Sequence, residues 1–216
     1  ENVNRTPSYI FQANSSFNFG NQSSFNKENI TKISGGLENS AKAWSISAEY
    51  FLVSNFTYFK NFYQADQQSS LFNILSLRAS KDFKLRKHLV WHAMILLQQN
   101  VGNSPVNLPL LFTRQQIGYE GNLGFKNLQM NTGLEIRYHT PYKANGYSPL
   151  IGQFFFQDQQ QVALAMPDIH AYLHFRIRSF TSYVRLENLN TMRFLDGFGF
   201  TNNNFSAPYY PYPGLV

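Results

Sequence analysis

The sequence predicts an all-β protein, and more narrowly an antiparallel, up-and-down transmembrane β-barrel. Three observations support this prediction. Apolar and polar residues alternate with a period of two along most of the chain. The alternating segments are long enough to cross a bilayer, and the connections between them are alternately short and long.

The stretch 168–178 shows the alternation most clearly. Its odd positions are apolar: Ile169, Ala171, Leu173, Phe175 and Ile177. Its even positions are polar or charged: Asp168, His170, Tyr172, His174, Arg176 and Arg178. Successive side chains of a strand point to opposite faces, so this segment has one apolar and one charged face. A strand between lipid and water needs such a pattern.

The same pattern recurs at 9–19, 42–52, 114–123 and 127–139, and more weakly at 89–97. With 43% hydrophobic residues, five apolar residues in succession at one parity arise by chance in about 1–2% of windows. Repeated occurrence therefore indicates a selected alternation. We expect about nine strands, at 6–19, 28–37, 42–55, 71–80, 86–99, 111–122, 127–140, 168–178 and 181–189.

The connections between these strands fall into two length classes. Short ones lie near 38–41, 81–85, 123–126 and 179–180. Longer ones lie near 20–27, 56–70, 100–110, 141–167 and 190–213. Outer-membrane barrels have short periplasmic turns and long outer loops. A soluble β-sandwich, the alternative all-β architecture, has no reason to sort its loops in this way.

The composition agrees with a barrel that has a wet interior. Aromatic residues make up 17% of the chain and charged residues 14%, against about 25% charged residues in a typical soluble domain. The mean hydropathy is -0.33, and no apolar run approaches the roughly 18–20 residues of a membrane helix. Low hydropathy does not exclude a barrel, because its apolar residues stand at alternate positions.

Charge and cysteine content exclude several functions. The net charge is +6, from 18 Lys and Arg less 12 Asp and Glu. The densest short basic cluster is Lys84, Arg86 and Lys87, which argues against nucleic acid as a partner. The absence of cysteine excludes disulfides, thiolate metal sites and a cysteine nucleophile.

Several stretches resemble a known family. "YHTPYKANGYSPLIGQFFFQ" (138–157), "MPDIHAYLHFRIRSFTSYVRLENLN" (166–190) and "APYYPYPGLV" (207–216) resemble the putative porin family of Bacteroidetes outer membranes. The resemblance is specific over 138–216 and rests on the barrel pattern elsewhere. The Glu-Asn and Tyr-Pro-x-Pro-Gly elements also resemble the ends of TonB-dependent receptors.

The resemblance implies that residues 1–216 are the C-terminal portion of one outer-membrane β-barrel domain. Members of the family continue after the Pro-Gly into a final strand and have a longer N-terminal half. We therefore expect a partial barrel whose last strand is missing. A tenth strand would restore the even number common in bacterial barrels.

The polar faces of the predicted strands, formed by alternate residues, contain the candidate pore-lining residues: Glu135, Arg137, His170, His174, Arg176, Arg178, Arg185 and Glu187. They would bias solute selectivity, or form a salt-bridge ladder that holds the wall together, and both roles can hold at once. Arg176 and Arg178 are expected to reach Glu187 across a tight turn. Candidate aromatic girdle residues are Tyr9, Trp44, Trp91, Tyr138 and Phe180.

Other chemistry has weaker support. His170 and His174 are four residues apart on one strand, about 13 Å at 3.3 Å per residue, and the same holds for His88 and His92; neither pair can ligate one metal ion. Asp168 with His170, or His139 with a serine, would suit a barrel protease or phospholipase, but recognisable partner motifs are lacking.

We therefore expect an outer-membrane channel for passive diffusion of small solutes, without cofactor or catalysis. The alternatives are a barrel subunit of an envelope complex for secretion or nutrient uptake, and the end of a TonB-dependent transporter. The expected partners are outer-membrane lipid and lipopolysaccharide (LPS), together with envelope proteins that dock on the outer loops.

Overall fold

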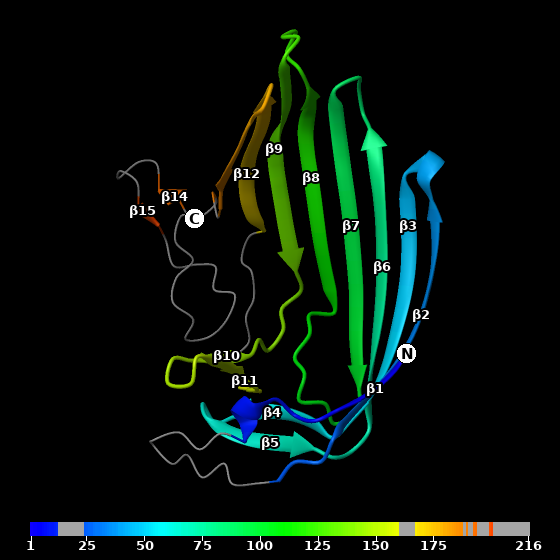
Figure 1. Ribbon diagram of the computed structural model, residues 1–216, viewed down its shortest axis with the longest axis vertical. Helices are drawn as coiled ribbons and strands as arrows, with labels where there is room; N and C mark the ends of the chain where they lie inside the picture. Colours follow the sequence, from blue (N-terminus) through cyan, green and yellow to red (C-terminus); the bar gives the residue numbers. More distant parts are fainter. Residues whose placement is uncertain (13–23, 160–166, 188, 190–191, 194–198, 201–216) are drawn as a thin grey trace.

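The structure, a computed structural model, describes residues 1–12, 24–159, 167–187, 189, 192–193 and 199–200. These residues form an all-β, antiparallel protein dominated by one nine-stranded sheet (Figure 1). In spatial order its strands are β1 (Asn2–Arg5), β2 (Glu28–Asn39), β3 (Trp44–Ser54), β6 (Phe72–Lys84), β7 (Leu89–Val101), β8 (Leu111–Gly121), β9 (Leu128–His139), β12 (Asp168–Ile177) and β13 (Phe180–Leu186).

Three small hairpins lie outside this sheet. β4 (Phe56–Lys60) pairs with β5 (Gln64–Gln68), β10 (Gly146–Ser148) with β11 (Gln153–Phe155), and β14 (Met192–Arg193) with β15 (Gly199–Phe200). Two single-turn 3-10 helices, η1 (Tyr9–Phe11) and η2 (Ser40–Lys42), complete the described elements. No helix in the described part of the chain is long and apolar enough to cross a membrane.

The expected up-and-down order is confirmed, because each strand of the main sheet pairs antiparallel with the next main-sheet strand along the chain. Eight of the nine expected strands are present, with ends that differ from expectation by at most four residues. The sheet is not closed. Among the described residues β1 and β13 are its two edges.

The strand expected at 6–19 is wrong in its described part. The sheet begins earlier, at Asn2–Arg5, and η1 follows at Tyr9–Phe11. Pro7 lacks a backbone N–H and cannot donate to a strand ladder. The Phe11 ring packs against Phe59 of β4, with ring centroids 4.7 Å apart. The apolar positions here therefore serve a contact with a loop hairpin. Residues 13–19 lie outside the described residues.

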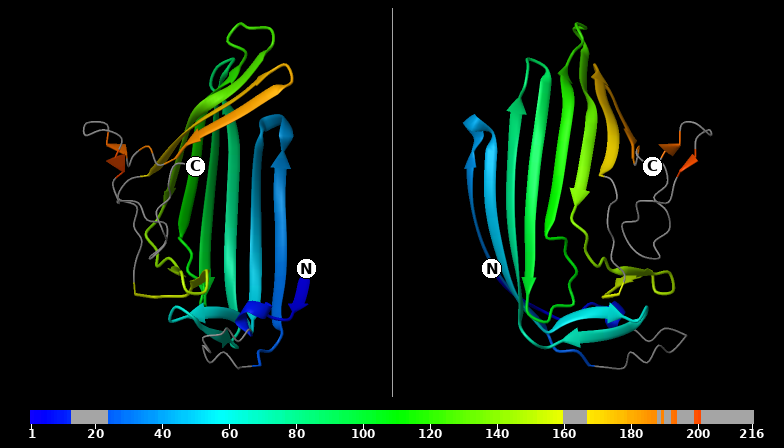
Figure 2. Two further views of the ribbon diagram at one scale, coloured as in Figure 1. Left: turned by 60° about the vertical axis from the view of Figure 1, so that its left-hand side comes forward. Right: turned by 180° about the vertical axis from the view of Figure 1, so that it is seen from behind.

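The short and long connections lie at opposite ends of the sheet, as expected (Figure 1). The turn after β2 is η2, where the Asn39 side chain accepts a hydrogen bond from the Lys42 backbone N–H at 2.9 Å. Two of the long connections are not plain loops. They contain the hairpins β4–β5 and β10–β11, which lie across the long-loop end of the sheet (Figure 2).

Burial in the sheet is inverted relative to a soluble protein. One face carries exposed apolar residues on every long strand, among them Leu37 at 71% exposure, Ile46, Leu77, Ile95, Ile117 and Leu134. The opposite face holds buried charged or polar groups, including Glu28, Glu135 and His170. Most of the buried apolar side chains, such as Phe59, Phe72 and Phe155, lie near the long-loop hairpins. The main apolar core therefore lies at the long-loop end and not against a face of the nine-stranded sheet.

Candidate functional site

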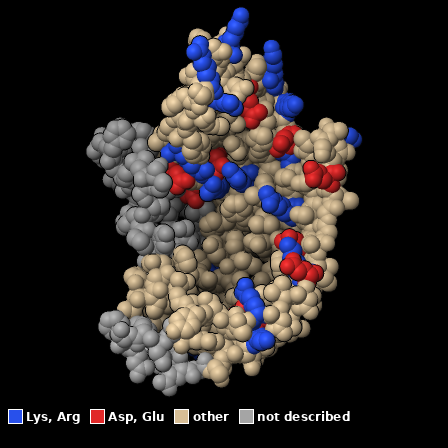
Figure 3. Space-filling view, in the orientation of Figure 1, with Lys and Arg blue, Asp and Glu red and all other residues tan. Residues whose placement is uncertain are grey.

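The strand register places most of the charged residues of six neighbouring strands on one face of the sheet, which we call the polar face; Lys81, opposite Trp44, is on the other face. Starting at β3, the pairs Glu49–Ser76, Ser76–Gln98, Met94–Arg114, Arg114–Arg137 and Arg137–Asp168 follow one another across the sheet. Side chains directly opposite in neighbouring strands share a face. Figure 3 shows this face hollowed, with Lys, Arg, Asp and Glu gathered around the hollow.

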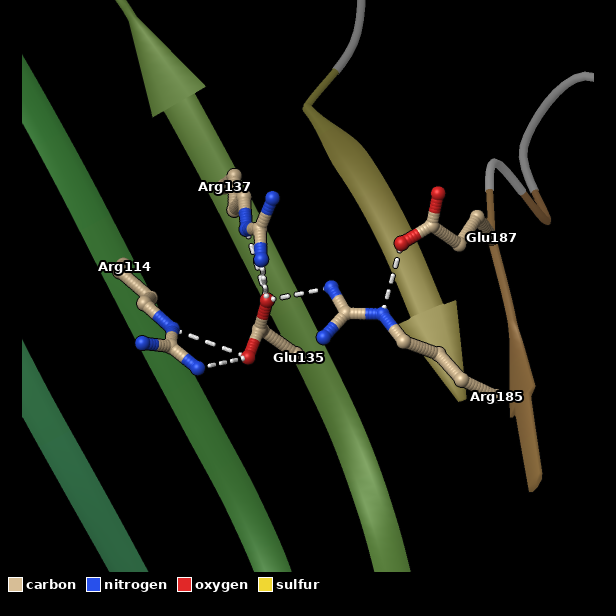
Figure 4. Close-up of polar contacts among 5 residues, drawn as sticks. All are labelled: Arg114, Glu135, Arg137, Arg185 and Glu187. Carbon is tan, nitrogen blue, oxygen red and sulfur yellow. Dashed lines mark hydrogen bonds and ion pairs between the residues drawn. The ribbon is translucent and has the colours of Figure 1, made fainter. Parts of the chain in front are cut away.

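The centre of the polar face is the carboxylate of Glu135 on β9 (Figure 4). Its Oε2 atom accepts hydrogen bonds from Arg114 Nε at 2.9 Å and Nη2 at 2.5 Å. Its Oε1 atom accepts from Arg137 Nε at 2.6 Å and Arg185 Nη2 at 3.0 Å. One carboxylate therefore joins three guanidinium groups from β8, β9 and β13. We call these four residues and Glu187 the ionic cluster.

The position of Glu135 offsets a like-charge repulsion that the strand register creates. Arg114 and Arg137 stand directly opposite one another on β8 and β9, and like charges in that arrangement destabilise a sheet. The Glu135 side chain reaches between them and neutralises both. It is only 3% exposed, so it is a buried charge that is both paired and hydrogen-bonded, as burial of a charge requires.

The solvent-facing part of the ionic cluster is mostly guanidinium. Arg114 is 42% exposed and Arg137 35%, whereas Glu135 is almost covered. Glu187 forms an ion pair with Arg185, with Nε and Oε1 2.8 Å apart, although the N–H is not aligned for a hydrogen bond. Asp168 stands opposite Arg137 in the register. The cluster can thus hold the wall together and present positive groups to the hollow.

A glycine step lies beside the ionic cluster. Gly118, Gly133 and Tyr172 are successive register partners on β8, β9 and β12. A Cβ atom at Gly118 would overlap the Tyr172 hydroxyl and lie 2.8 Å from the Thr132 carbonyl oxygen. A Cβ atom at Gly133 would overlap the Ile117 carbonyl oxygen. Glycine therefore leaves space here for close strand approach and for the tyrosine side chain.

Further polar contacts extend along the polar face. His92 Nδ1 lies 2.8 Å from Asp82 Oδ1, and His92 Nε2 lies 3.6 Å from Glu120 Oε1. Near the other edge of the sheet, Lys32 Nζ lies 2.7 Å from Glu49 Oε1. The face is therefore wettable over its width, with charges of both signs distributed along it.

Most predicted pore-lining residues lie together on this face. Glu135, Arg137, His170, His174, Arg176 and Arg185 are on its register positions, and Glu187 follows directly after β13. Arg178 is not on a strand but in the β12–β13 turn, with a φ of 54°. The expected Arg176–Glu187 contact is wrong. Arg176 stands opposite Thr181 near the turn, whereas Glu187 pairs with Arg185 at the other end of β13.

The predicted girdle residues divide between two ends of the apolar face. Trp44 and Phe180 begin β3 and β13 at the short-turn end, and Trp91 lies close to the start of β7. Tyr138 lies at the long-loop end of β9. Tyr9 belongs to η1 and not to a strand. Trp91 stacks on Phe83 with ring centroids 4.8 Å apart and donates from Nε1 to Gln115 Oε1 at 2.9 Å.

Two residues of the observed site were not among the predicted site residues. Arg114 forms two hydrogen bonds with Glu135, and Tyr172 covers the glycine step. Arg114 stands on the polar parity of its strand, which is the signal that could have identified it. Among the described residues, no group of three or more His, Asp or Glu side chains could hold a metal ion.

The whole sequence matches one protein family. The match is to the family described as "Putative porin", and it covers residues 1–216. The chain belongs to this putative porin family. The match extends well beyond the segment 138–216, on which the resemblance in the sequence was specific. Membership assigns a porin-like role in general terms. No curated protein and no solved structure matches the chain.

Proposed function

We propose that the chain forms part of the wall of an outer-membrane β-barrel that acts as a passive, water-filled channel for small polar solutes. The observation that carries this proposal is the division of one sheet into an exposed apolar face and a hollowed, charged face. Hydrocarbon can contact the first without penalty, and water can hydrate the second. Membership of the porin family supports the outer membrane as the location.

The two edges of the sheet support a larger barrel. Within the part of the chain that the structure describes, β1 and β13 each leave one row of backbone groups without a strand partner in the main sheet. Lipid cannot satisfy such groups, at a cost of several kcal/mol for each. We infer that further strands close the wall, so that residues 1–216 are the C-terminal portion of one barrel domain. The expected even strand number would follow from such closure.

The ionic cluster would set the ion preference at its level of the channel. Its buried group is the Glu135 carboxylate, and its two most exposed groups are the guanidinium groups of Arg114 and Arg137, with the Glu187 carboxylate less exposed than either. A solute that passes would meet positive charge more directly than negative charge. The proposal includes no cofactor and no chemical step. Lipid and LPS would contact the apolar face, and envelope proteins could dock on the long-loop end.

The test is single-channel conductance of the purified full-length protein in a planar bilayer. The proposal predicts stepwise, ohmic openings. Arg176→Glu reverses a charge at an exposed polar-face position outside the ionic cluster, and it should shift the reversal potential in a salt gradient towards cations. Protein that inserts correctly but conducts no current would contradict the channel and favour a structural subunit of an envelope complex.

A further inference from the structure

Two long connections that lie far apart in the sequence join into one layer at the long-loop end. This loop layer consists of the β4–β5 hairpin and of residues 144–159 with the β10–β11 hairpin (Figures 1 and 2). The Phe156 backbone N–H donates to the Phe59 carbonyl oxygen at 2.6 Å, and Lys60 and Phe156 form a parallel bridge. The Asn107 side chain donates to the Gln157 carbonyl oxygen at 2.7 Å and ties the layer to a third connection.

Aromatic packing fixes the layer. Phe59 and Phe155 are buried at 4% and 5% exposure. The rings of Phe62 and Phe155 lie 4.6 Å apart, and Tyr58 meets Phe156 edge to face at 5.8 Å. These separations are those of favourable aromatic pairs. The layer is thus held by its own core.

A groove of about 410 Å³ lies between the two halves of the loop layer. Four aromatic side chains form its apolar wall: Tyr58, Phe62, Phe155 and Phe156. Its volume falls within the roughly 300–1,000 Å³ of small-molecule sites, which combine apolar walls with a few polar groups. The mixture of rings and polar side chains distinguishes it from the apolar groove at Trp44 and Phe83 on the lipid-facing side.

The polar wall of the groove carries little net charge. Asn61 and Gln159 contribute amides, and Asp158 contributes one carboxylate. Among the described lining residues the one cation is Lys60, which forms an ion pair with Asp66, with Nζ and Oδ2 2.7 Å apart. Amide groups donate and accept hydrogen bonds and a carboxylate accepts them, so together they can pair with the hydroxyl groups of a ligand. The wall therefore suits a ligand rich in hydroxyls rather than an ion.

An aromatic residue at the rim of the groove has a strained backbone conformation. Asn61 and Phe62 have φ angles of 50° and 71°, consecutive left-handed residues in the β4–β5 turn. This region favours glycine and is rare for a bulky side chain. Strain of this kind persists where surrounding contacts fix the residue, here the ring contact of Phe62 with Phe155, and it clusters at ligand sites. Phe62 remains 42% exposed, so part of its surface is accessible to a ligand.

We propose that this groove binds a neutral, polyhydroxylated solute of the size of a mono- or disaccharide. The apolar C–H face of a sugar ring would lie on Phe62 and its aromatic neighbours. The hydroxyl groups would exchange hydrogen bonds with Asn61, Asp158 and Gln159. The site goes beyond the proposed channel, because binding in the groove requires no conduction. If the channel holds, the groove lies at its outer end.

The experiment is isothermal titration of the detergent-solubilised full-length protein with cellobiose, maltose and, as a charged comparison, glucose 6-phosphate. The variant Phe62→Gly removes the ring and its contact with Phe155 but relieves the left-handed strain, which offsets part of the lost packing. Tyr63→Ala is the matched control, because Tyr63 is the next residue, is 40% exposed and does not belong to the groove lining. Asp158→Ala tests the polar wall independently.

The proposal predicts saturable binding of at least one neutral disaccharide, weaker by about tenfold in Phe62→Gly. Asp158→Ala should weaken it as well, and Tyr63→Ala should leave it unchanged. Absence of binding by both disaccharides, stronger binding of the phosphate sugar, or equal binding by the parent and both groove variants would overturn the proposal. The titration uses no bilayer, so its outcome does not depend on whether the protein conducts current, and the two proposals can fail independently.

Discussion

Arg185 and Glu135 are 50 residues apart in the sequence, yet Arg185 Nη2 lies 3.0 Å from Glu135 Oε1. Glu135 is on β9 and Arg185 on β13, and the whole of β12 runs between these two strands. The contact therefore spans three strands of the wall. Together with Arg114 on β8, the carboxylate links β8, β9 and β13 across a span of four neighbouring strands. The Glu135 carboxylate therefore stabilises the sheet and partly neutralises the positive charge on its polar face.

The first prediction concerns Glu135→Gln. The change leaves three guanidinium groups close together without their shared anion. Breaking a fully buried ion pair costs about 3–5 kcal/mol, and we expect less here, about 1–3 kcal/mol, because water reaches the arginines. Urea unfolding in detergent micelles or lipid vesicles measures the change in the free energy of unfolding. Glu187→Gln is the matched control, with an expected loss of under about 1 kcal/mol. Equal losses in the free energy of unfolding for the two variants would contradict the central role of Glu135 in the ionic cluster.

The second prediction concerns the glycine step. Gly118→Ala forces a methyl group against the Tyr172 hydroxyl and the Thr132 carbonyl oxygen. Overpacking of this kind costs about 1–3 kcal/mol. Gly35→Ala on β2 is the control, because a Cβ atom there meets nothing within 4 Å, and it should be neutral or slightly stabilising. The same unfolding assay compares the two, and a neutral Gly118→Ala would show that the strands are further apart than described.

The third prediction uses the two native tryptophans as reporters of the lipid boundary. Trp44 and Trp91 both lie on the apolar face, at the short-turn end. In vesicles their fluorescence should be quenched more by lipids brominated near the headgroup than by lipids brominated near the chain end, because aromatic girdles lie at the interface. Quenching by neither lipid would place this face outside the bilayer.

The fourth prediction concerns the pH dependence of the loop layer. Burial alone would raise the pKa of Asp66, but hydrogen bonds from Lys60, Gln67 and Tyr58, together with the Lys60 charge, outweigh it and lower the pKa. A carboxylate with a lowered pKa stabilises the folded state above its unfolded pKa of about 3.9 and loses this contribution as the pH falls through the folded value.

Hydrogen exchange of peptides from 56–68 should therefore be constant from neutral pH down to about pH 5, after correction for the intrinsic rate, and should lose protection below about pH 4. Asp66→Asn should lower the protection at neutral pH and flatten this dependence. A profile in Asp66→Asn identical to that of the parent would contradict the assignment.

The strands could be predicted from the sequence because alternation is a local property. β9 and β12 have one polar and one apolar face along their whole length, and their ends were placed within one residue. The segment 6–19 failed because Phe11 packs against Phe59, a contact 48 residues away that no local pattern records. The hairpin β4–β5 was missed for a related reason. Its Phe56, Tyr58 and Phe59 pack within the loop layer, so its apolar residues do not follow a single parity.

The ionic cluster was only partly predictable. Glu135 and Arg137 are two residues apart on one strand, so their contact follows from strand geometry alone. Recruitment of Arg114 and Arg185 depends on the register of four strands, and a shift of one residue would turn either side chain to the other face. The same limit explains why Arg176 was expected to reach Glu187, whereas the observed pair of Arg185 and Glu187, two residues apart on one face, depends on no strand register.

The most direct test of the central claim, that the polar face lines water and the apolar face contacts lipid, uses two adjacent positions on β7. The chain has no cysteine, so Gln98→Cys on the polar face and Leu97→Cys on the apolar face each give a single thiol. Gln98 is outside the ionic cluster, and Leu97 is 43% exposed on the other face. Single-channel current is recorded before and after addition of a water-soluble, positively charged thiol reagent. We predict a stepwise loss of current in Gln98→Cys and no change in Leu97→Cys; the reverse result, or equal modification of both, would contradict the assignment of the two faces.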